Sequence, residues 1–301
     1  MTKLQHLKTF VAVADSGGVR AAARMLGVSQ VAASKALKTL ENELGEQLFV
    51  RSTHGVTITY AGTALMPRAR LILEQMSRIA VDMGRISGSS ASVGITPFAN
   101  FFLLKAALAN FRRTQPLVQL RLVDGLLSQV VPALRDGSLD FALVASFTAD
   151  IGDDLVFEPC FVARNAFVVR AGHPLAGKVW PIAQLLEYEW TQNEALDGLH
   201  GYLLRWLDSL GLPQPRTIIC NSFATLLGVT LSTDSIACAP EILASHPIFQ
   251  SQLAPLAIDV EVPASTFGFL ARRDVPLSKA ATQLKICLRR AAAGVTQLVP
   301  V

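Results

Sequence analysis

The fold is decided by the stretch from Gly17 to Leu44, which reads GGVRAAARMLGVSQVAASKALKTLENEL. This stretch predicts two helices with a tight turn between them. The first helix, from about Val19 to Leu26, is rich in alanine, so that another helix can pack closely against it. Gly27 can adopt the positive φ that ends a helix, and Ser29 is a favourable N-cap for the second helix.

The second helix has one apolar face and one polar, basic face. Its apolar residues repeat with the period of a helix. A recognition helix in a helix-turn-helix reads base edges with its first turns and holds phosphates with its cations. The alternative is an ordinary helical hairpin whose lysines are only solvated. The apolar face comprises Ala33, Ala36, Leu37, Leu40 and Leu44, and the expected DNA contacts are Ser29, Gln30, Val31, Ser34, Lys35 and Lys38.

The distribution of charge agrees with a nucleic-acid-binding segment at the N-terminal end. The chain has 301 residues, enough for two domains, and it is 51% hydrophobic, which argues against disorder. Residues 1–88 hold 11 lysines and arginines against 6 aspartates and glutamates, whereas the remainder holds 16 against 17. Positive charge therefore gathers where phosphates would be met.

The sequence predicts no membrane segment, metal site or cofactor site. No apolar run approaches the ~20 residues of a membrane span, and the first residues lack the apolar core of a signal peptide. The four cysteines are scattered, without a Cys-x-x-Cys pair or histidines at ligand spacing. We therefore expect a cytoplasmic protein with reduced thiols and no resident metal or cofactor.

A two-stranded wing is expected directly after the second helix. Residues 47–51 form a short strand, residues 52–55 a turn and residues 56–58 a returning strand. Arg51 and His54 would then lie near the sugar-phosphate backbone or the minor groove of DNA. His54 is equally well explained as a solvated turn residue.

A long helix with a regular apolar seam follows the wing. Thr59 is a plausible N-cap, the helix runs to about Ile86, and Pro67 is an irregularity near its start. A lone helix cannot bury such a seam on itself, so we expect it to pair with a second copy. The seam comprises Leu65, Ala69, Ile72, Met76, Ile79, Met83 and Ile86.

The pattern of expected secondary structure changes after a short flexible linker at residues 87–91. Strands now alternate with helices, and this order predicts a parallel sheet flanked by helices. The last three residues, from Val299 to Val301, are expected to be a free tail. The first strands are expected at about residues 92–95, 118–123 and 140–144, with helices at 97–113 and 128–136 between them.

With these parts in order, the whole chain resembles the LysR-type transcriptional regulators. The segment Leu134–Leu143 matches the family's L-x-x-G-x-x-D pattern. Val31 stands where the family usually has proline, and its apolar side chain could meet a thymine methyl group. Gly18 stands where the family often has a serine cap. The N-terminal pattern comprises Ala22, Ala23, Leu26, Val28, Ser29, Gln30, Ser34, Lys35, Leu40, Glu41, Leu44, Gly45, Leu48, Phe49, Arg51, Gly55, Val56, Thr59, Ala61 and Gly62.

The resemblance implies an α/β protein in three parts. These are a winged helix-turn-helix DNA-binding domain at 1–58, a linker and dimerisation helix at 59–88, and an effector-binding domain at 89–301. The last part is implied to be periplasmic-binding-protein-like, with lobe I at about 92–161 and 267–301 and lobe II at about 162–266. The implied partners are double-stranded promoter DNA, a small-molecule inducer between the lobes, further copies in a homodimer or homotetramer, and RNA polymerase.

Several helix starts and strand ends are candidates for the inducer site. Parallel strands bind ligands at their carboxyl ends, beside helix N-termini whose N–H groups favour anions. The phenylalanines would form apolar walls, so we expect a small aromatic or apolar anion, with a non-aromatic metabolite anion as the alternative. Each phenylalanine could instead be core, and the hydroxyl residues mere helix caps. The candidates are Thr96, Pro97, Phe98, Ser128, Ala145, Ser146, Phe147, Ser222 and Phe223.

Signals for catalysis are weak. The sequence contains no H-E-x-x-H, no G-x-x-x-x-G-K-[ST] and no G-x-S-x-G, and no Ser-His-Asp set can be assembled from its spacing. We therefore expect no enzyme activity and assign no catalytic residue. Two other classes stay open, an α/β enzyme fused to a DNA-binding module and a dimeric interaction protein without a ligand.

Overall fold

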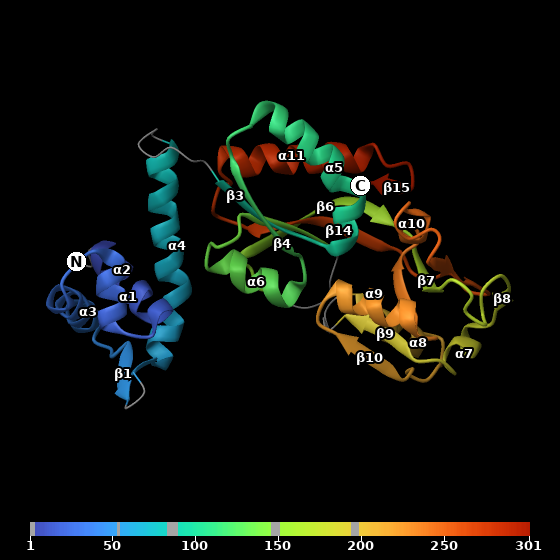
Figure 1. Cartoon of the computed structure of the whole chain (residues 1–301), viewed down its shortest axis with the longest axis horizontal. Helices are drawn as coiled ribbons and strands as arrows, with labels where there is room; N and C mark the ends of the chain where they lie inside the picture. The colour runs from blue at the N-terminus through green and yellow to red at the C-terminus, as the bar shows by residue number, and fades with distance from the viewer. Residues whose placement is uncertain (1–3, 53–54, 83–89, 146–150, 194–198) are drawn as a thin grey trace. The chain divides into compact units, whose positions relative to one another are not determined.

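Figure 1 shows the chain as a computed structural model. The structure describes residues 4–52, 55–82, 90–145, 151–193 and 199–301. The chain divides into two compact units. The first unit comprises Met1–Ser89 with Pro132–Leu139, and the second comprises Ser90–Val131 with Asp140–Val301.

The first unit begins with three helices and a two-stranded antiparallel wing. The turn before the third helix is built as predicted, because Gly27 has a φ of 66° and Ser29 Oγ accepts a hydrogen bond from Ala32 N at 3.1 Å. Gly18 leaves the second helix without a side-chain cap. The winged helix-turn-helix is confirmed. Its elements are α1 (Leu4–Ser16), α2 (Val19–Leu26), α3 (Gln30–Leu44), β1 (Phe49–Ser52) and β2 (Gly55–Ile58).

A small apolar core fixes α3 and the wing against α1. Phe10 of α1 and Leu40 of α3 are fully buried, and the Phe10 ring packs on Phe49 of β1 with centroids 5.4 Å apart. The prediction that Leu44 shares the buried face is wrong, since its side chain is 43% exposed. The buried face of α3 ends at Leu40, and the left-handed Gly45 turns the chain away directly after Leu44.

The long helix α4 (Tyr60–Asp82) begins where the sequence predicts. Thr59 Oγ1 accepts a hydrogen bond from Gly62 N at 3.0 Å and donates one to Gln47 O at 2.6 Å. The same hydroxyl therefore caps α4 and ties it to the residue that enters the wing. Pro67 lies inside the helix, as predicted.

The apolar seam of α4 is buried at its start and exposed further along. Ala69 belongs to the core of the first unit, and Leu65 packs against that core. Ile72, Met76 and Ile79 are 46%, 45% and 55% exposed. The two remaining seam residues, at positions 83 and 86, lie outside the described residues. A stripe of unpaired apolar side chains thus runs along the second half of the described helix.

The second unit contains a six-stranded mixed sheet of order β15-β6-β14-β5-β3-β4. The predicted parallel part is present, because β3 pairs in parallel with β4 and with β5. The sheet as a whole is mixed, since β14, β6 and β15 extend it in antiparallel fashion. Its strands are β3 (Ser90–Ile95), β4 (Gln119–Asp124), β5 (Phe141–Ala145), β6 (Leu155–Ala163), β14 (Ser265–Arg272) and β15 (Leu298–Pro300).

Two long helices, α5 (Pro97–Thr114) and α11 (Lys279–Ala293), lie side by side against this sheet (Figure 1). Phe111 of α5 and Leu284 of α11 are fully buried between them and the strands. Phe161 and Phe267 stack on neighbouring strands with centroids 5.1 Å apart. The shorter α6 (Leu127–Arg135) connects β4 to β5.

A second mixed sheet of order β10-β9-β11-β7-β12 forms the other lobe of this unit, with the pair β13-β8 beside it. The strands β8, β9, β12 and β13 and the helix α10, each of at most four residues, were not predicted. The elements are β7 (Asn165–Arg170), β8 (Val179–Trp180), α7 (Ile182–Leu185), β9 (Trp190–Asn193), α8 (Leu199–Ser209), β10 (Thr217–Cys220), α9 (Phe223–Ser232), β11 (Ile236–Pro240), α10 (Ile242–Ser245), β12 (Leu253–Pro255) and β13 (Ala257–Ile258).

The chain crosses between the two sheets where β6 runs into β7, and it returns into β14. The Asn165 side-chain amide, which is 6% exposed, donates hydrogen bonds to Pro263 O at 2.7 Å and to Ser265 Oγ at 2.8 Å. It thereby ties the outgoing segment to the returning one. This tie fixes where the two lobes join.

The prediction of a free C-terminal tail is wrong. Val299 pairs with Val162 as part of β15, and Val301 N donates a hydrogen bond to Cys160 O at 3.3 Å. Leu298 is only 4% exposed and anchors the strand. The edge of β6 would otherwise present unpaired backbone groups, which the tail satisfies. None of the described helices is long and apolar enough to span a membrane.

Candidate DNA-binding helix and ligand cavity

The first turns of α3 present the residues that the sequence assigns to DNA. Gln30, Lys35 and Lys38 are exposed, and Val31 is 78% exposed. The opposite face is anchored in the core, so the helix cannot rotate without exposing apolar surface. Ser34 is half-buried beside this face. The arrangement leaves a rigid helix with an accessible polar and basic surface.

Other parts of the expected DNA surface are less fully described. Ser29 uses its hydroxyl for the N-cap of α3, although its position at the helix start stays accessible. Arg51 belongs to β1, but its side chain lies outside the described residues, as does the whole of His54. All the DNA contacts expected from the sequence stay predictions.

Replacing Lys35 or Lys38 by alanine should reduce the salt dependence of DNA binding. A lysine that neutralises one phosphate releases about one counterion, so the slope of log K against log salt should fall by about one unit. Fluorescence anisotropy titrations at several salt concentrations measure this slope. Lys105→Ala, an exposed change on α5, is the matched control and should leave the slope unchanged. If a variant kept the wild-type slope, the lysine that it lacks would not be a phosphate contact.

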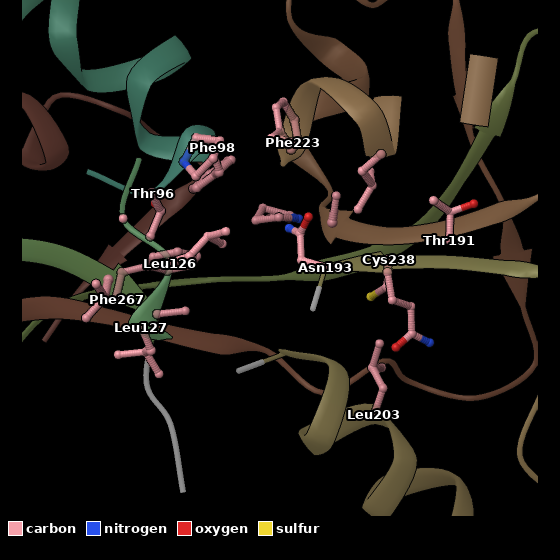
Figure 2. Close-up of a pocket in the computed structure, with 18 residues that line it drawn as sticks. Thr96, Phe98, Leu126, Leu127, Thr191, Asn193, Leu203, Phe223, Cys238 and Phe267 are labelled. Carbon is pink, nitrogen blue, oxygen red and sulfur yellow. The ribbon is translucent and has the colours of Figure 1, made fainter. Parts of the chain in front are cut away.

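A cavity of ≈150 Å³ opens in the second unit, between its two sheets (Figure 2). That volume is enough for a benzene-sized molecule. Figure 2 shows Thr96, Phe98 and Phe267 on one side and Phe223 and Cys238 on the other. The lining comprises Thr96, Pro97, Phe98, Gly125, Leu126, Leu127, Val144, Ala145, Thr191, Gln192, Asn193, Leu203, Phe223, Leu226, Cys238, Ala239, Pro240 and Phe267.

The start of α5 is held tightly at the cavity wall. Thr96 Oγ1 accepts a hydrogen bond from Ala99 N at 3.4 Å, and Thr96 N donates one to Leu143 O at 2.9 Å. Gly125 approaches so closely that a Cβ there would lie 2.6 Å from Thr96 N. The loop after β4 therefore needs glycine to pass beside this helix start. The hydroxyl of Thr96 is thus positioned at the cavity by its own backbone.

The start of α9 reaches the cavity through Phe223 and Leu226 rather than through the capping serine. Ser222 Oγ accepts a hydrogen bond from Thr225 N at 3.1 Å and caps the helix, but Ser222 is not part of the lining. Phe223 does line the cavity, and its ring also lies 5.9 Å from that of Phe101. One side of the phenylalanine therefore serves packing and the other faces the cavity.

The cavity brings together five of the residues expected from the sequence. Ser128 is exposed and outside the lining, because α6 begins one residue earlier than predicted and places Leu127 at the cavity instead. Residues 146 and 147 lie outside the described residues, so their predicted roles stay untested. As ligand contacts, the whole set stays a prediction. The five lining residues are Thr96, Pro97, Phe98, Ala145 and Phe223.

Sequence reasoning missed the polar groups that β9 and its neighbours bring to the cavity. Thr191 Oγ1 donates a hydrogen bond to Ser235 Oγ at 2.7 Å, whereas Gln192 and Asn193 keep buried polar atoms without a partner among the described residues. The strand β9 (Trp190–Asn193) has one apolar residue followed by three polar ones, so it lacks the alternation that marks a half-buried strand. The one available signal was a run of three polar residues directly after Trp190.

The described lining of the cavity carries no charged side chain. Burial raises the pKa of the Cys238 thiol far above its usual value, so the thiol stays protonated at neutral pH and serves as a small apolar wall. Within the described ranges, no group of three or more histidine, cysteine, aspartate or glutamate residues could hold a metal ion. The described lining therefore offers apolar walls and uncharged hydrogen-bonding groups.

These two parts define a DNA-binding transcriptional regulator with a separate effector-binding domain, and the comparison with known families agrees. A family model described as "Bacterial regulatory helix-turn-helix protein, lysR family" matches residues 4–63. A second, described as "LysR substrate binding domain", matches residues 88–293. The chain therefore belongs to the LysR family. The resemblance predicted from the sequence is confirmed, and the chain is a regulator rather than an enzyme.

Several curated relatives are similar over most of the chain. The HTH-type transcriptional regulator TdcA of Escherichia coli (strain K12) is 27% identical over 288 residues, covering 94% of this chain and 91% of that protein. The regulator GalR of Pseudomonas putida is 26% identical over 290 residues, covering 95% of this chain and 73% of that protein. Both are described as transcriptional regulators, as expected for the family.

Solved structures share the fold over nearly the full length. A full-length OxyR variant from Pseudomonas aeruginosa has a TM-score of 0.70 at 22% identity, with 96% of this chain and 95% of that chain covered. CbnR, a LysR family transcriptional regulator, has a TM-score of 0.67 at 21% identity, with 96% and 99% covered. CbnR complexed with its target DNA has a TM-score of 0.65 at 21% identity, with 96% and 100% covered. The predicted fold class is confirmed.

Proposed function

We propose that this regulator binds promoter DNA through α3 and the wing, and that a small molecule in the cavity switches those contacts. The observation that carries the proposal is the exposed, basic first half of a core-anchored α3, in the same chain as a cavity with unpaired polar atoms. The proposed division of labour is DNA binding in residues 1–58, dimerisation in 59–88 and effector binding in 89–301.

Pairing of α4 with the α4 of a second copy is part of the proposal. The exposed stripe of Ile72, Met76 and Ile79 has the four-and-three spacing of a coiled-coil seam. A dimer would place two recognition helices in successive major grooves, about 34 Å apart. Two dimers would form a homotetramer that spans a longer operator. Ligand binding would favour one arrangement of the DNA contacts and thereby change the access of RNA polymerase.

The inducer is either an anion or a neutral molecule, and one feature of the cavity supports each. The small aromatic or apolar anion expected from the sequence is supported by the start of α5 at the cavity, because helix N-termini favour negative charge. A neutral ligand is supported by the absence of lysine and arginine from the described lining. In both cases the apolar walls favour a compact, largely apolar body.

Replacing Thr96 by valine should abolish the response to the inducer while DNA binding is kept. The change removes the hydroxyl at the cavity and leaves α3 untouched. A reporter gene behind the intergenic DNA next to this protein's own gene, screened against small molecules, identifies the inducer. Occupancy of the same DNA by wild type and variant is then measured by fluorescence anisotropy.

The matched control is Thr96→Ser, which keeps the hydroxyl that caps α5. We expect this variant to respond as the wild type does. A valine variant with a normal response would place the ligand elsewhere. A valine variant that also lost DNA binding would show that Thr96 acts through folding, because loss of a helix cap costs about 0.5–2 kcal/mol.

A further inference from the structure

Gln192 is a buried side chain whose hydrogen-bonding groups are both unused. Its side chain is 5% exposed, and neither its amide nitrogen nor its amide oxygen has a partner in the described part of the chain. A buried amide without partners loses the hydrogen bonds that water gave it in the unfolded chain. Since Gln192 lines the cavity, a molecule bound there is the natural partner.

The position of Gln192 on β9 explains why the protein itself does not satisfy it. Alternation along a strand puts Gln192 on the same face as Trp190, which belongs to an apolar cluster with Leu203 and Leu207 of α8. The Trp190 Nε1 already donates its hydrogen bond to Leu185 O at 3.0 Å, and the leucine side chains have none to offer. The amide is therefore held in an apolar wall at the carboxyl end of β9.

A second unused group lies one residue further along. Asn193 Oδ1 is buried and has no hydrogen-bond partner in the part of the chain that the structure describes. Figure 2 shows the Asn193 amide directed into the space between the Thr96 side and the Phe223 side of the cavity. Both residues line the cavity, although alternation along β9 directs their side chains to opposite faces of the strand.

These groups demand hydrogen-bond donors as well as acceptors from a ligand. Whichever way round a side-chain amide is placed, it presents one acceptor oxygen and one donor nitrogen. A carboxylate can accept from the nitrogen but has no hydrogen for the oxygen, so it would leave at least the Gln192 oxygen unpaired. A carboxamide satisfies both atoms at once, because its own edge carries one donor and one acceptor.

We propose that the inducer is a neutral molecule with a compact apolar body and a carboxamide-like edge that pairs with Gln192. Lactams and nucleobases carry the same edge. The described lining offers no cation to neutralise an anion. This inference rests on the proposed role of the cavity as the inducer site, and it decides between the two charges that the proposed function leaves open.

Three probes of one shape test the edge directly: benzamide, benzoate and methyl benzoate. Benzamide supplies a donor and an acceptor, benzoate supplies acceptors with a charge, and methyl benzoate supplies acceptors without a charge. Each is titrated into the full-length wild-type protein at neutral pH by isothermal titration calorimetry. We expect benzamide to bind at least about tenfold more tightly than either of the others, because sites that pair a polar group reject analogues that leave it unpaired.

The Gln192→Leu variant tests whether Gln192 itself recognises the carboxamide edge of the probe. We expect the preference for benzamide over methyl benzoate to fall to within about twofold, since leucine pairs with neither probe. The variant should still fold, and its Tm without ligand should be equal to or above that of the wild type, because an unpaired buried amide has been removed. Gln119→Leu, at an exposed position on the amino end of β4, is the matched control and should keep the preference.

Each other result overturns the inference. Tighter binding of benzoate than of benzamide would show that the cavity prefers an anion. Equal binding of all three probes would mean that water satisfies Gln192. Binding of none up to their solubility would show that the cavity does not take a compact aromatic amide. A benzamide preference that survives in Gln192→Leu would place the recognition elsewhere. Promoter binding, measured on the same preparation, distinguishes these outcomes from failure of the proposed function, which would show as loss of sequence-dependent DNA binding.

Discussion

Replacing Gly62 by alanine should unfold much of the winged helix and abolish DNA binding. An added Cβ would lie 2.4 Å from Leu48 O and 2.6 Å from Ile58 Cγ1. Leu48 O already accepts the hydrogen bond from Thr59 N at 3.0 Å, so it cannot move aside without breaking the junction between the wing and α4. Overpacking against a fixed backbone atom costs about 3 kcal/mol, and the first unit has only a small core to absorb it.

Hydrogen exchange followed by mass spectrometry locates this effect within the chain. We expect amide protection to fall in residues 4–58 and to persist in residues 90–131 and 140–301, because these belong to separate compact units. The matched control is Gly18→Ser, since nothing lies within 4 Å of a Cβ at Gly18 and its φ of −178° suits any residue. Full protection and full DNA affinity in Gly62→Ala would contradict the packing described for this junction.

Replacing Gln30 by alanine should weaken binding to the target DNA and relax its sequence preference. Gln30 is exposed on the first turn of α3, and a glutamine amide can bind adenine through two hydrogen bonds. Such a contact contributes roughly 1–3 kcal/mol of discrimination, so we expect an affinity loss of about 5- to 150-fold on the target and little change on scrambled DNA.

Competition titrations with single-base variants of the target show which base pair the side chain reads. The wild type should discriminate at one position where the alanine variant does not. Asn42→Ala is the matched control, because Asn42 is an exposed amide on the last turns of the same helix. If Gln30→Ala lowered affinity for all DNA equally, the residue would contact the backbone or act through folding, and its assignment as a base reader would be wrong.

The N-terminal half of the fold could be predicted closely, because its signals are local. Ser29 and Thr59 are helix caps, and Gly27 marks a left-handed turn, so each can be recognised from a few neighbouring residues. The exposure of Leu44 could not be foreseen, because it depends on where the covering core ends rather than on the period of the helix.

The polar half of the ligand cavity could not be predicted, because it depends on contacts between distant segments. Thr96 was found through its cap position, but Gln192 lies on a strand whose three polar residues in a row do not alternate with apolar ones. Its lack of partners emerges only when α8 and β9 are packed together. The strand at Val299 was not predicted for a similar reason. It forms only because it pairs with β6, which is distant in sequence.

The most direct test of the account is a fluorescence anisotropy titration of the full-length protein with the intergenic DNA beside its own gene. The titration is repeated with a scrambled duplex of the same length and at several salt concentrations. We predict tight binding that depends on the sequence, together with a steep decrease in affinity as salt rises, because lysines of α3 would hold phosphates while Gln30 reads bases. Weak binding of equal strength to both duplexes would contradict the assignment of this DNA as the target and of α3 as its reader.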